Sequence, residues 1–142
     1  MSGPRITIVT LGVADLQRAR AFYAEGLGFT VSSSSNDQVV FIEAGGVVLG
    51  LYPRELLAED AQLNPEGSGF GGITLARNVG SENEVDVALA VAKRAGARIL
   101  KPAQKVFWGG YSGYFADLDG HPWEVAFNPH WKLDERGAVV LP

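Results

Sequence analysis

The sequence predicts an α+β fold in which two βαβββ modules form a curled mixed sheet around a shared cleft. Three observations support this class. Strand-like runs alternate with helical patterns, the order of one strand, one helix and three strands occurs twice, and turn residues separate the strands. One such module cannot cover the apolar face of its own sheet, so the two are expected to pack together. We therefore expect residues 1–142 to form a single domain.

The first module is predicted within residues 6–57 and contains one helix. Asp15 is a suitable N-cap residue, and apolar side chains recur at helical spacing from Leu16 to Tyr23. Gly26 and Gly28 follow and are expected to end this helix. The strands are expected at residues 6–13, 29–31, 39–42 and 47–52.

The second module is predicted within residues 71–129, after a polar, Gly-rich linker at residues 58–72. Ser81 and Glu84 form a capping-box pattern ahead of a helix that ends at Gly96. The linker glycines do not form a phosphate loop, because no Lys-Ser or Lys-Thr pair accompanies them. Strands are expected at residues 71–76, 98–100, 111–116 and 122–127, with a further candidate at 106–108, and residues 130–142 form a C-terminal tail.

The composition is that of an ordinary globular protein and excludes several classes of partner. The chain has 46% hydrophobic and 20% charged residues, and its formal net charge is −4. No nucleic-acid partner is expected, because neutralising phosphates takes clustered Lys and Arg side chains. No segment approaches the length of a membrane span, and there is no cysteine for a disulfide framework. A soluble, cytoplasmic protein without a membrane partner is therefore expected.

Several short motifs resemble those of one large family. They are Val13-Ala14-Asp15-Leu16, Phe22-Tyr23, Leu27-Gly28-Phe29 and the stretch from Phe115 to Val125. Together they resemble the vicinal oxygen chelate superfamily, which includes glyoxalase I, extradiol dioxygenases, and fosfomycin-resistance and bleomycin-binding proteins. The resemblance runs from about Ile6 to Pro129 and implies the paired-module fold described above.

The resemblance also implies where a metal ion would be bound in the related enzymes. Their four ligand positions fall on Ile8, Gly50, Gly72 and Glu124 of this chain, and three of these have no donor atom on the side chain. Divalent metal sites normally need three or more protein ligands, so no metal cofactor is expected. A shift of the alignment by two residues does not help, because it brings in Ile6, Thr10, Thr74 and Ala126. His121 and His130 are expected at turns or in solvent, not as ligands.

The predicted cleft could still bind a small molecule without a metal ion, through aromatic side chains and one charge. Glu124 is the predicted charged contact, and it is also the candidate catalytic residue. Pairing of Glu124 with Lys101 or Lys105 would instead make the carboxylate structural. The predicted ligand-binding residues are Tyr52, Trp108, Tyr111, Phe115 and Glu124, and an equally weighted interpretation is that the rings only pack in the core.

The pairing of the last two strands decides which rings lie beside Glu124. In an odd register, Tyr111, Gly113 and Phe115 share a face with Glu124, while Trp123 points into the helix-covered core. The prediction of Tyr111 and Phe115 as ligand-binding residues is based on this odd register. In an even register, Ser112 and Tyr114 take their place.

We thus expect a metal-independent protein that binds a small molecule, an aromatic or antibiotic-like compound. The alternative is a lyase or isomerase that uses Glu124 as general base, or an enzyme whose divalent metal is completed by other donors, such as those of a partner chain. A catalytically silent scaffold is a third interpretation. The apolar tail residues 138–141 would be exposed on a monomer, so a homodimer is expected.

Overall fold

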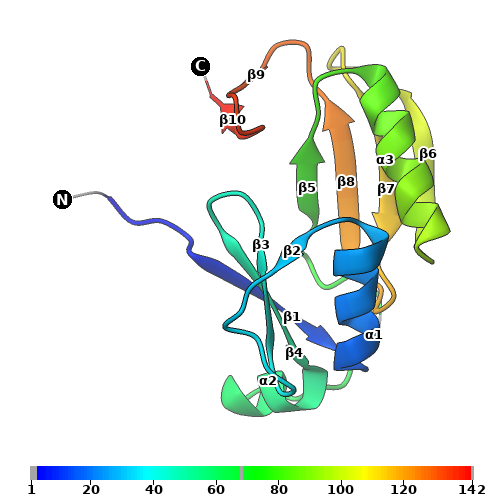
Figure 1. Cartoon of the computed structure of the whole chain (residues 1–142). Helices are drawn as coiled ribbons and strands as arrows, with labels where there is room; N and C mark the ends of the chain where they lie inside the picture. The colour runs from blue at the N-terminus through cyan, green and yellow to red at the C-terminus, as the bar shows by residue number, and fades with distance from the viewer. Residues whose placement is uncertain (1–2, 68, 142) are drawn as a thin grey trace. The chain divides into compact units, whose positions relative to one another are not determined.

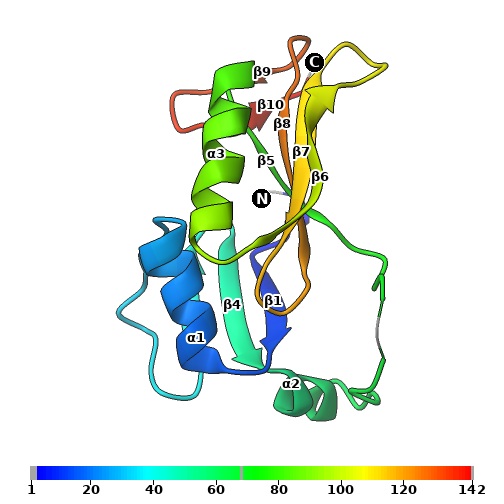
Figure 2. The same ribbon diagram turned by 90° about the vertical axis from the view of Figure 1, so that its right-hand side faces the viewer.

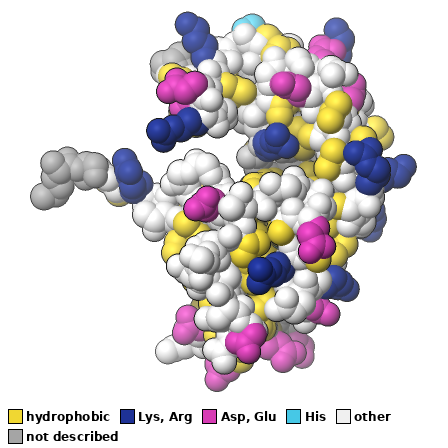
Figure 3. All heavy atoms as spheres, viewed as in Figure 1, with side chains coloured by type: hydrophobic (Ala, Val, Ile, Leu, Met, Phe, Trp, Pro, Cys, Tyr) yellow, Lys and Arg dark blue, Asp and Glu magenta, His cyan; other side chains and the backbone are white. Residues whose placement is uncertain are grey.

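The computed structural model describes residues 3–67 and 69–141. The chain divides into two compact units, residues 1–69 and residues 70–142 (Figure 1). Each unit contains one four-stranded mixed sheet. No helix among the described residues is long and apolar enough to cross a membrane. Lys and Arg side chains are interspersed with Asp and Glu on the face seen in Figure 3.

The first unit follows the predicted order of one strand, one helix and three strands. The sheet order is β1-β4-β3-β2, with β1 parallel to β4 and the other neighbours antiparallel. The helix α1 starts where expected, because the Asp15 carboxylate accepts a hydrogen bond of 3.0 Å from the backbone N–H of Arg18. The elements are β1 (Ile8–Val13), α1 (Leu16–Ala21), a π-helical turn η1 (Phe22–Gly26), β2 (Thr30–Val31), β3 (Val40–Glu43), β4 (Val48–Pro53) and α2 (Arg54–Asp60).

One face of the first sheet is apolar and is covered by α1 and η1 (Figure 2). Side chains alternate along β4, so Leu49 and Leu51 are buried on this face while Gly50 and Tyr52 belong to the other face. Phe22 and Tyr23 meet edge to face, with 5.1 Å between the ring centroids. The core of the first unit consists of Leu11, Val13, Ala19, Phe22, Tyr23, Val40, Ile42, Leu49 and Leu51.

The second unit repeats this order and adds a hairpin. Its sheet order is β5-β8-β7-β6, with β5 parallel to β8 and the other neighbours antiparallel. The N-terminus of α3 is capped by Ser81, as predicted: the Ser81 hydroxyl accepts from the N–H of Glu84. The Glu84 carboxylate accepts from the N–H of Gly80, one residue before the position that a capping box uses. The elements are β5 (Leu75–Asn78), α3 (Glu82–Arg94), β6 (Arg98–Lys105), β7 (Tyr111–Ala116), β8 (Pro122–Phe127), β9 (Lys132–Leu133) and β10 (Val139–Val140).

The helix α3 covers one face of the second sheet (Figure 1). Val85, Leu89 and Ala92 form its buried stripe, at the spacing that places side chains on one side of a helix. On the sheet they meet the buried side chains of β7 and β8. The structure therefore confirms an α+β fold with two βαβββ modules.

Two of the expected boundaries in the linker region are wrong. The strand expected at residues 71–76 is displaced, since β5 begins only at Leu75. Gly72 has a φ of +87°, which is incompatible with an extended strand. The linker expected from Ala58 begins inside α2, whose sequence Arg54–Asp60 consists of good helix formers.

The further strand candidate at residues 106–108 is a turn. The N–H of Gly109 bonds to the carbonyl of Val106 and the N–H of Val106 to the carbonyl of Gly110, both at 3.0 Å. Gly109 has a φ of +94°, a conformation that only glycine adopts readily. The strand β6 instead extends to Lys105, beyond the expected end at residue 100.

Gly113 in β7 lets the sheet pack closely against α3. A Cβ atom at this position would lie 2.7 Å from Cδ1 of Leu89 and 2.9 Å from both the Lys101 carbonyl oxygen and the Ala103 nitrogen. The register between β6 and β7 shifts next to this point, between Lys101 and Gln104. Two of the three close atoms belong to the backbone, which cannot rotate away.

We predict that Gly113→Ala lowers the free energy of unfolding by about 1–3 kcal/mol, because the added methyl group overpacks this site. Urea unfolding followed by circular dichroism measures the change. Gly71→Ala is the matched control, since a Cβ there has no neighbour within 4 Å. The control should change stability by less than about 1 kcal/mol. Equal unfolding midpoints for both variants would show that the close approach at Gly113 is unimportant.

Candidate functional site

The antiparallel pairing of β7 with β8 places Glu124 beside Tyr114. The two residues are direct partners in the register, as are Ser112 with Ala126 and Phe115 with Trp123. Directly paired residues project from the same face of a sheet. Glu124 thus shares its face with Tyr114 and Ser112, which is the even register. The expectation that Tyr111 and Phe115 share the Glu124 face is wrong.

The loop between the two strands explains this register. Ala116 pairs with Pro122, so residues 117–121 form the connection. The Asp117 carboxylate accepts hydrogen bonds from the N–H groups of Asp119 at 2.9 Å and His121 at 2.8 Å. The Asp117 N–H also bonds to the His121 carbonyl at 3.0 Å. These bonds hold the turn in one geometry, and turn geometry together with loop length sets the register of the two strands in a hairpin.

Tyr111 and Phe115 lie instead on the face that α3 covers. The Tyr111 hydroxyl donates a hydrogen bond of 2.8 Å to Asp86 of α3. Phe115 is buried and stacks on Trp123, with 6.0 Å between the ring centroids and an interplanar angle of 4°. Both side chains take part in packing the helix onto the sheet, because odd-numbered positions of β7 face α3.

Glu124 and Tyr114 interact directly on the opposite face. Both side chains are half-buried, and a hydrogen bond joins them. Burial raises the pKa of the Tyr114 hydroxyl above 10.0, and the nearby charge of Glu124 and the hydrogen bond to it raise it further. The hydroxyl therefore keeps its proton at neutral pH and donates a hydrogen bond to the carboxylate.

No cation neutralises the Glu124 carboxylate in the part of the chain that the structure describes. Lys105, one of the two expected partners, lies 3.9 Å from Glu82 of α3. Lys101 is in register with Tyr114 and forms no ion pair with Glu124 among the described residues. The lysine pairing considered from the sequence is thus absent there.

Trp108 does not lie on the face of β7 and β8 that carries Glu124, and Tyr52 belongs to the other unit. Trp108 lies in the turn between β6 and β7, where its ring occupies the space next to Gly110. It is 36% exposed, so one side of the indole remains accessible. Tyr52 belongs to the first unit, where it follows Gly50 on the face of β4 opposite α1.

The positions implied for a metal ion do not fit one. In the first sheet Gly50 pairs with Thr10, and at the equivalent place in the second sheet Glu124 pairs with Ala76. Gly72 precedes β5 and lies in no strand. Within residues 3–67 and 69–141, no three His, Asp or Glu side chains gather into a group that could hold a metal ion. A single carboxylate beside glycine and alanine offers too few donors.

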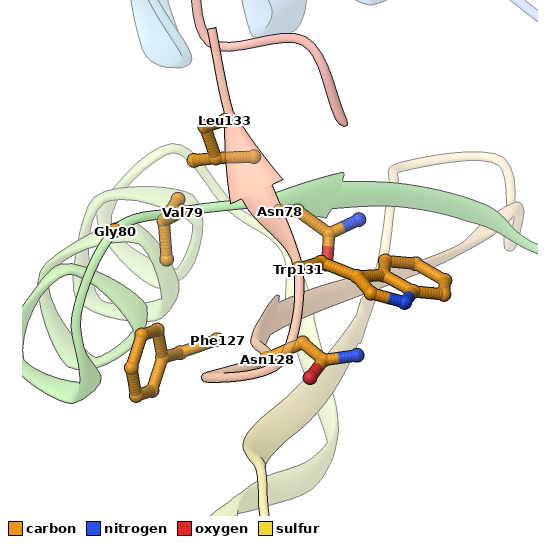
Figure 4. Close-up of a pocket in the computed structure, with 7 residues that line it drawn as sticks. All are labelled: Asn78, Val79, Gly80, Phe127, Asn128, Trp131 and Leu133. Carbon is orange, nitrogen blue, oxygen red and sulfur yellow. The ribbon is translucent and has the colours of Figure 1, made fainter. Parts of the chain in front are cut away.

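A cavity of about 170 Å³ lies at the ends of β5 and β8 (Figure 4). The carboxamides of Asn78 and Asn128 and the ring of Trp131 lie on one side of it, and Phe127 points to the other. None of the lining residues was predicted from the sequence. The one sequence signal near these residues is the pair Asn128-Pro129, which indicates the end of the preceding strand. The lining residues are Asn78, Val79, Gly80, Phe127, Asn128, Trp131 and Leu133.

Solved structures share this architecture. A glyoxalase-related enzyme from Fulvimarina pelagi is 36% identical, with a TM-score of 0.88 over 96% of this chain and 97% of that one. A glyoxalase/bleomycin resistance protein/dioxygenase from Nocardioides is 28% identical, with a TM-score of 0.71 over 89% and 85%. A lactoylglutathione lyase from Agrobacterium tumefaciens is 23% identical and shares the fold, with a TM-score of 0.68 over 89% and 96%.

No curated protein matches the chain. The model of the Glyoxalase/Bleomycin resistance protein/Dioxygenase superfamily matches residues 5–125, which includes both βαβββ modules up to the middle of β8. The match therefore includes Glu124 and Tyr114. The chain belongs to the glyoxalase/bleomycin resistance protein/dioxygenase superfamily.

Proposed function

We propose that this protein binds a small molecule without a metal cofactor and that Glu124 is the charged contact for the ligand. The observation that carries the proposal is the half-buried Glu124 carboxylate, which has a tyrosine as hydrogen-bond donor and no cationic partner among the described residues. A carboxylate has room for several hydrogen bonds, and Tyr114 uses one. The remaining acceptor positions suit a ligand that carries a positive charge or N–H donors.

Metal independence is supported by the side chains at the implied ligand positions. Ile8, Gly50 and Gly72 contribute no donor atom, and neither Thr10 nor Ala76 offers a strong ligand beside them. In the related enzymes the ion polarises a substrate oxygen or binds dioxygen. A chain that lacks the ion needs a different function for the predicted cleft. Binding of an aromatic or antibiotic-like compound is such a role.

We predict that the purified protein contains no stoichiometric transition metal and has no glyoxalase I activity, since only one of the four implied positions bears a donor. Elemental analysis after dialysis tests the first part. Adding zinc, nickel or iron should leave the melting temperature unchanged, because binding to the folded state would raise it. One equivalent of metal per chain would refute metal independence.

We further predict that a cationic aromatic compound binds in preference to an anionic one of similar shape. Benzamidine should raise the melting temperature and benzoate should not. In Glu124→Gln the binding free energy of benzamidine should weaken by about 1–3 kcal/mol, because a charge-assisted hydrogen bond is lost. Titration calorimetry measures this loss.

Glu59→Gln is the matched control, because Glu59 is an exposed carboxylate of α2 in the other unit. This variant should bind benzamidine as the parent chain does. Unchanged binding by Glu124→Gln would remove Glu124 from the ligand site.

An enzyme is the second candidate function, because the relative from Fulvimarina pelagi with 36% identity is described as a glyoxalase-related enzyme. Here Glu124 would act as the general base of a lyase or isomerase, with the Tyr114 hydroxyl as its neighbour. In a metal-dependent form, donors from a partner chain would complete the site. The metal analysis above separates that form from the proposed binding function.

We also propose that the protein is a cytoplasmic homodimer without nucleic-acid or membrane partners. In support of an interface, the tail exposes apolar side chains: Val140 is 51% and Leu141 66% exposed. We predict a mass by light scattering of twice the 15.1 kDa of one chain. A mass of one chain at micromolar concentration would contradict the dimer.

A further inference from the structure

The cavity at the ends of β5 and β8 has a polar side with unused hydrogen-bonding capacity (Figure 4). Asn78 contributes a carboxamide that forms no hydrogen bond with any residue that the structure describes. The Asn128 oxygen accepts from the N–H of His130 at 2.9 Å, which leaves its NH₂ group as a donor. The cavity therefore presents donors from both asparagines and one acceptor from Asn78.

The ring of Trp131 adds a flat apolar surface beside these two carboxamides. It is 41% exposed, so the indole can stack on a second ring. Leu133 and Val79 contribute further apolar surface. A volume of about 170 Å³ is smaller than the roughly 300–1,000 Å³ of a drug-sized site, so it suits one ring.

The chemistry of the lining residues selects among flat ligands. No Lys or Arg lines the cavity among the described residues, and the chain has a net charge of −4, so an anion has no cationic partner there. A purely apolar ring would leave the Asn78 carboxamide unpaired when it displaces water. An amide-like edge, with one carbonyl oxygen and one N–H, matches the acceptor and the donors.

We propose that this cavity binds a flat ring that carries an uncharged amide edge, such as an aromatic carboxamide or a lactam. Asn78 pairs with the amide edge, Asn128 donates a further hydrogen bond, and Trp131 stacks on the ring. The site is distinct from Glu124, because it uses neither the carboxylate nor Tyr114.

Asn78 of the cavity and Glu124 nevertheless share one face of the second sheet, whereas Phe127 of the cavity pairs with Tyr111 on the other face. Asn78 is in register with Ala126, two positions along β8 from Glu124, so all three side chains project from the same side. Strand geometry puts the Cα atoms of Asn78 and Glu124 roughly 8 Å apart. If the proposed function is correct, the complete ligand has an amide-bearing ring and a cationic group on opposite ends.

Benzamide tests the cavity alone, with ¹H–¹⁵N NMR as the readout. We expect it to shift the indole signal of Trp131 and the side-chain amide signal of Asn78 in a saturable way. Trp131→Phe assigns the indole signal. Benzoate, which has the same shape but no N–H and a negative charge, should shift neither.

Asn78→Ala should weaken benzamide binding about tenfold, because two hydrogen bonds are lost. Asn78→Asp is a second variant of nearly the same shape that removes the N–H donors, and it should weaken binding as well. The matched control is Asn83→Ala, an exposed asparagine of α3, which should bind benzamide like the parent. The proposal is overturned if benzamide leaves the Trp131 signal unmoved, or if Asn78→Ala and Asn78→Asp bind it as well as the parent.

Glu124→Gln separates this inference from the proposed function. Benzamide should bind this variant unchanged, whereas 4-(aminomethyl)benzamide should lose about tenfold in affinity relative to the parent chain. Loss of benzamide binding in Glu124→Gln would refute a separate amide site. Equal binding of 4-(aminomethyl)benzamide to parent and variant, with benzamide bound to both, would refute the role of Glu124 and leave the amide site in place.

Discussion

The loop at residues 117–121 sets the pairing of β7 with β8, and the chemistry of the second unit depends on that pairing. The Asp117 carboxylate accepts hydrogen bonds from two backbone N–H groups across the loop. The result is that Tyr114, and not Tyr111 or Phe115, stands next to Glu124. A change of the register by one residue would exchange the two faces of β7 completely.

The face toward α3 is specified by packing. Phe115 stacks on Trp123, and Gly113 between Tyr111 and Phe115 leaves the space that Leu89 fills. These side chains contribute buried apolar area, which stabilises the unit at roughly 25 cal/mol per Å². The polar groups of this face pair within the unit, as Tyr111 does with Asp86, whereas Glu124 stands on the opposite face.

On that opposite face the second unit carries the charge of Glu124. Of the four positions that the resemblance implies for a metal ion, Glu124 is the one with a donor on its side chain, but its neighbours Ala76 and Tyr114 are not a ligand set. A half-buried carboxylate without a cation is costly to keep unless a hydrogen bond compensates it. Tyr114 supplies one such bond, which offsets part of the cost of burying the carboxylate.

The sequence by itself determined the α+β class, the two βαβββ modules and the helix starts at Asp15 and Ser81, because caps, turns and side-chain periodicity are local signals. Its short motifs also indicated the superfamily. It also showed that Ile8, Gly50 and Gly72 have no donor atoms. Only the tertiary structure decided which rings lie beside Glu124, since an odd and an even register are equally compatible with the strand pattern.

The cavity of Asn78, Asn128 and Trp131 was beyond sequence reasoning for the same reason. Its residues lie up to 55 positions apart along the chain, from Asn78 to Leu133, and meet only because β5 pairs in parallel with β8 and the chain turns back after Asn128. Contacts made by distant strands depend on pairing and loop geometry, and no local pattern encodes them.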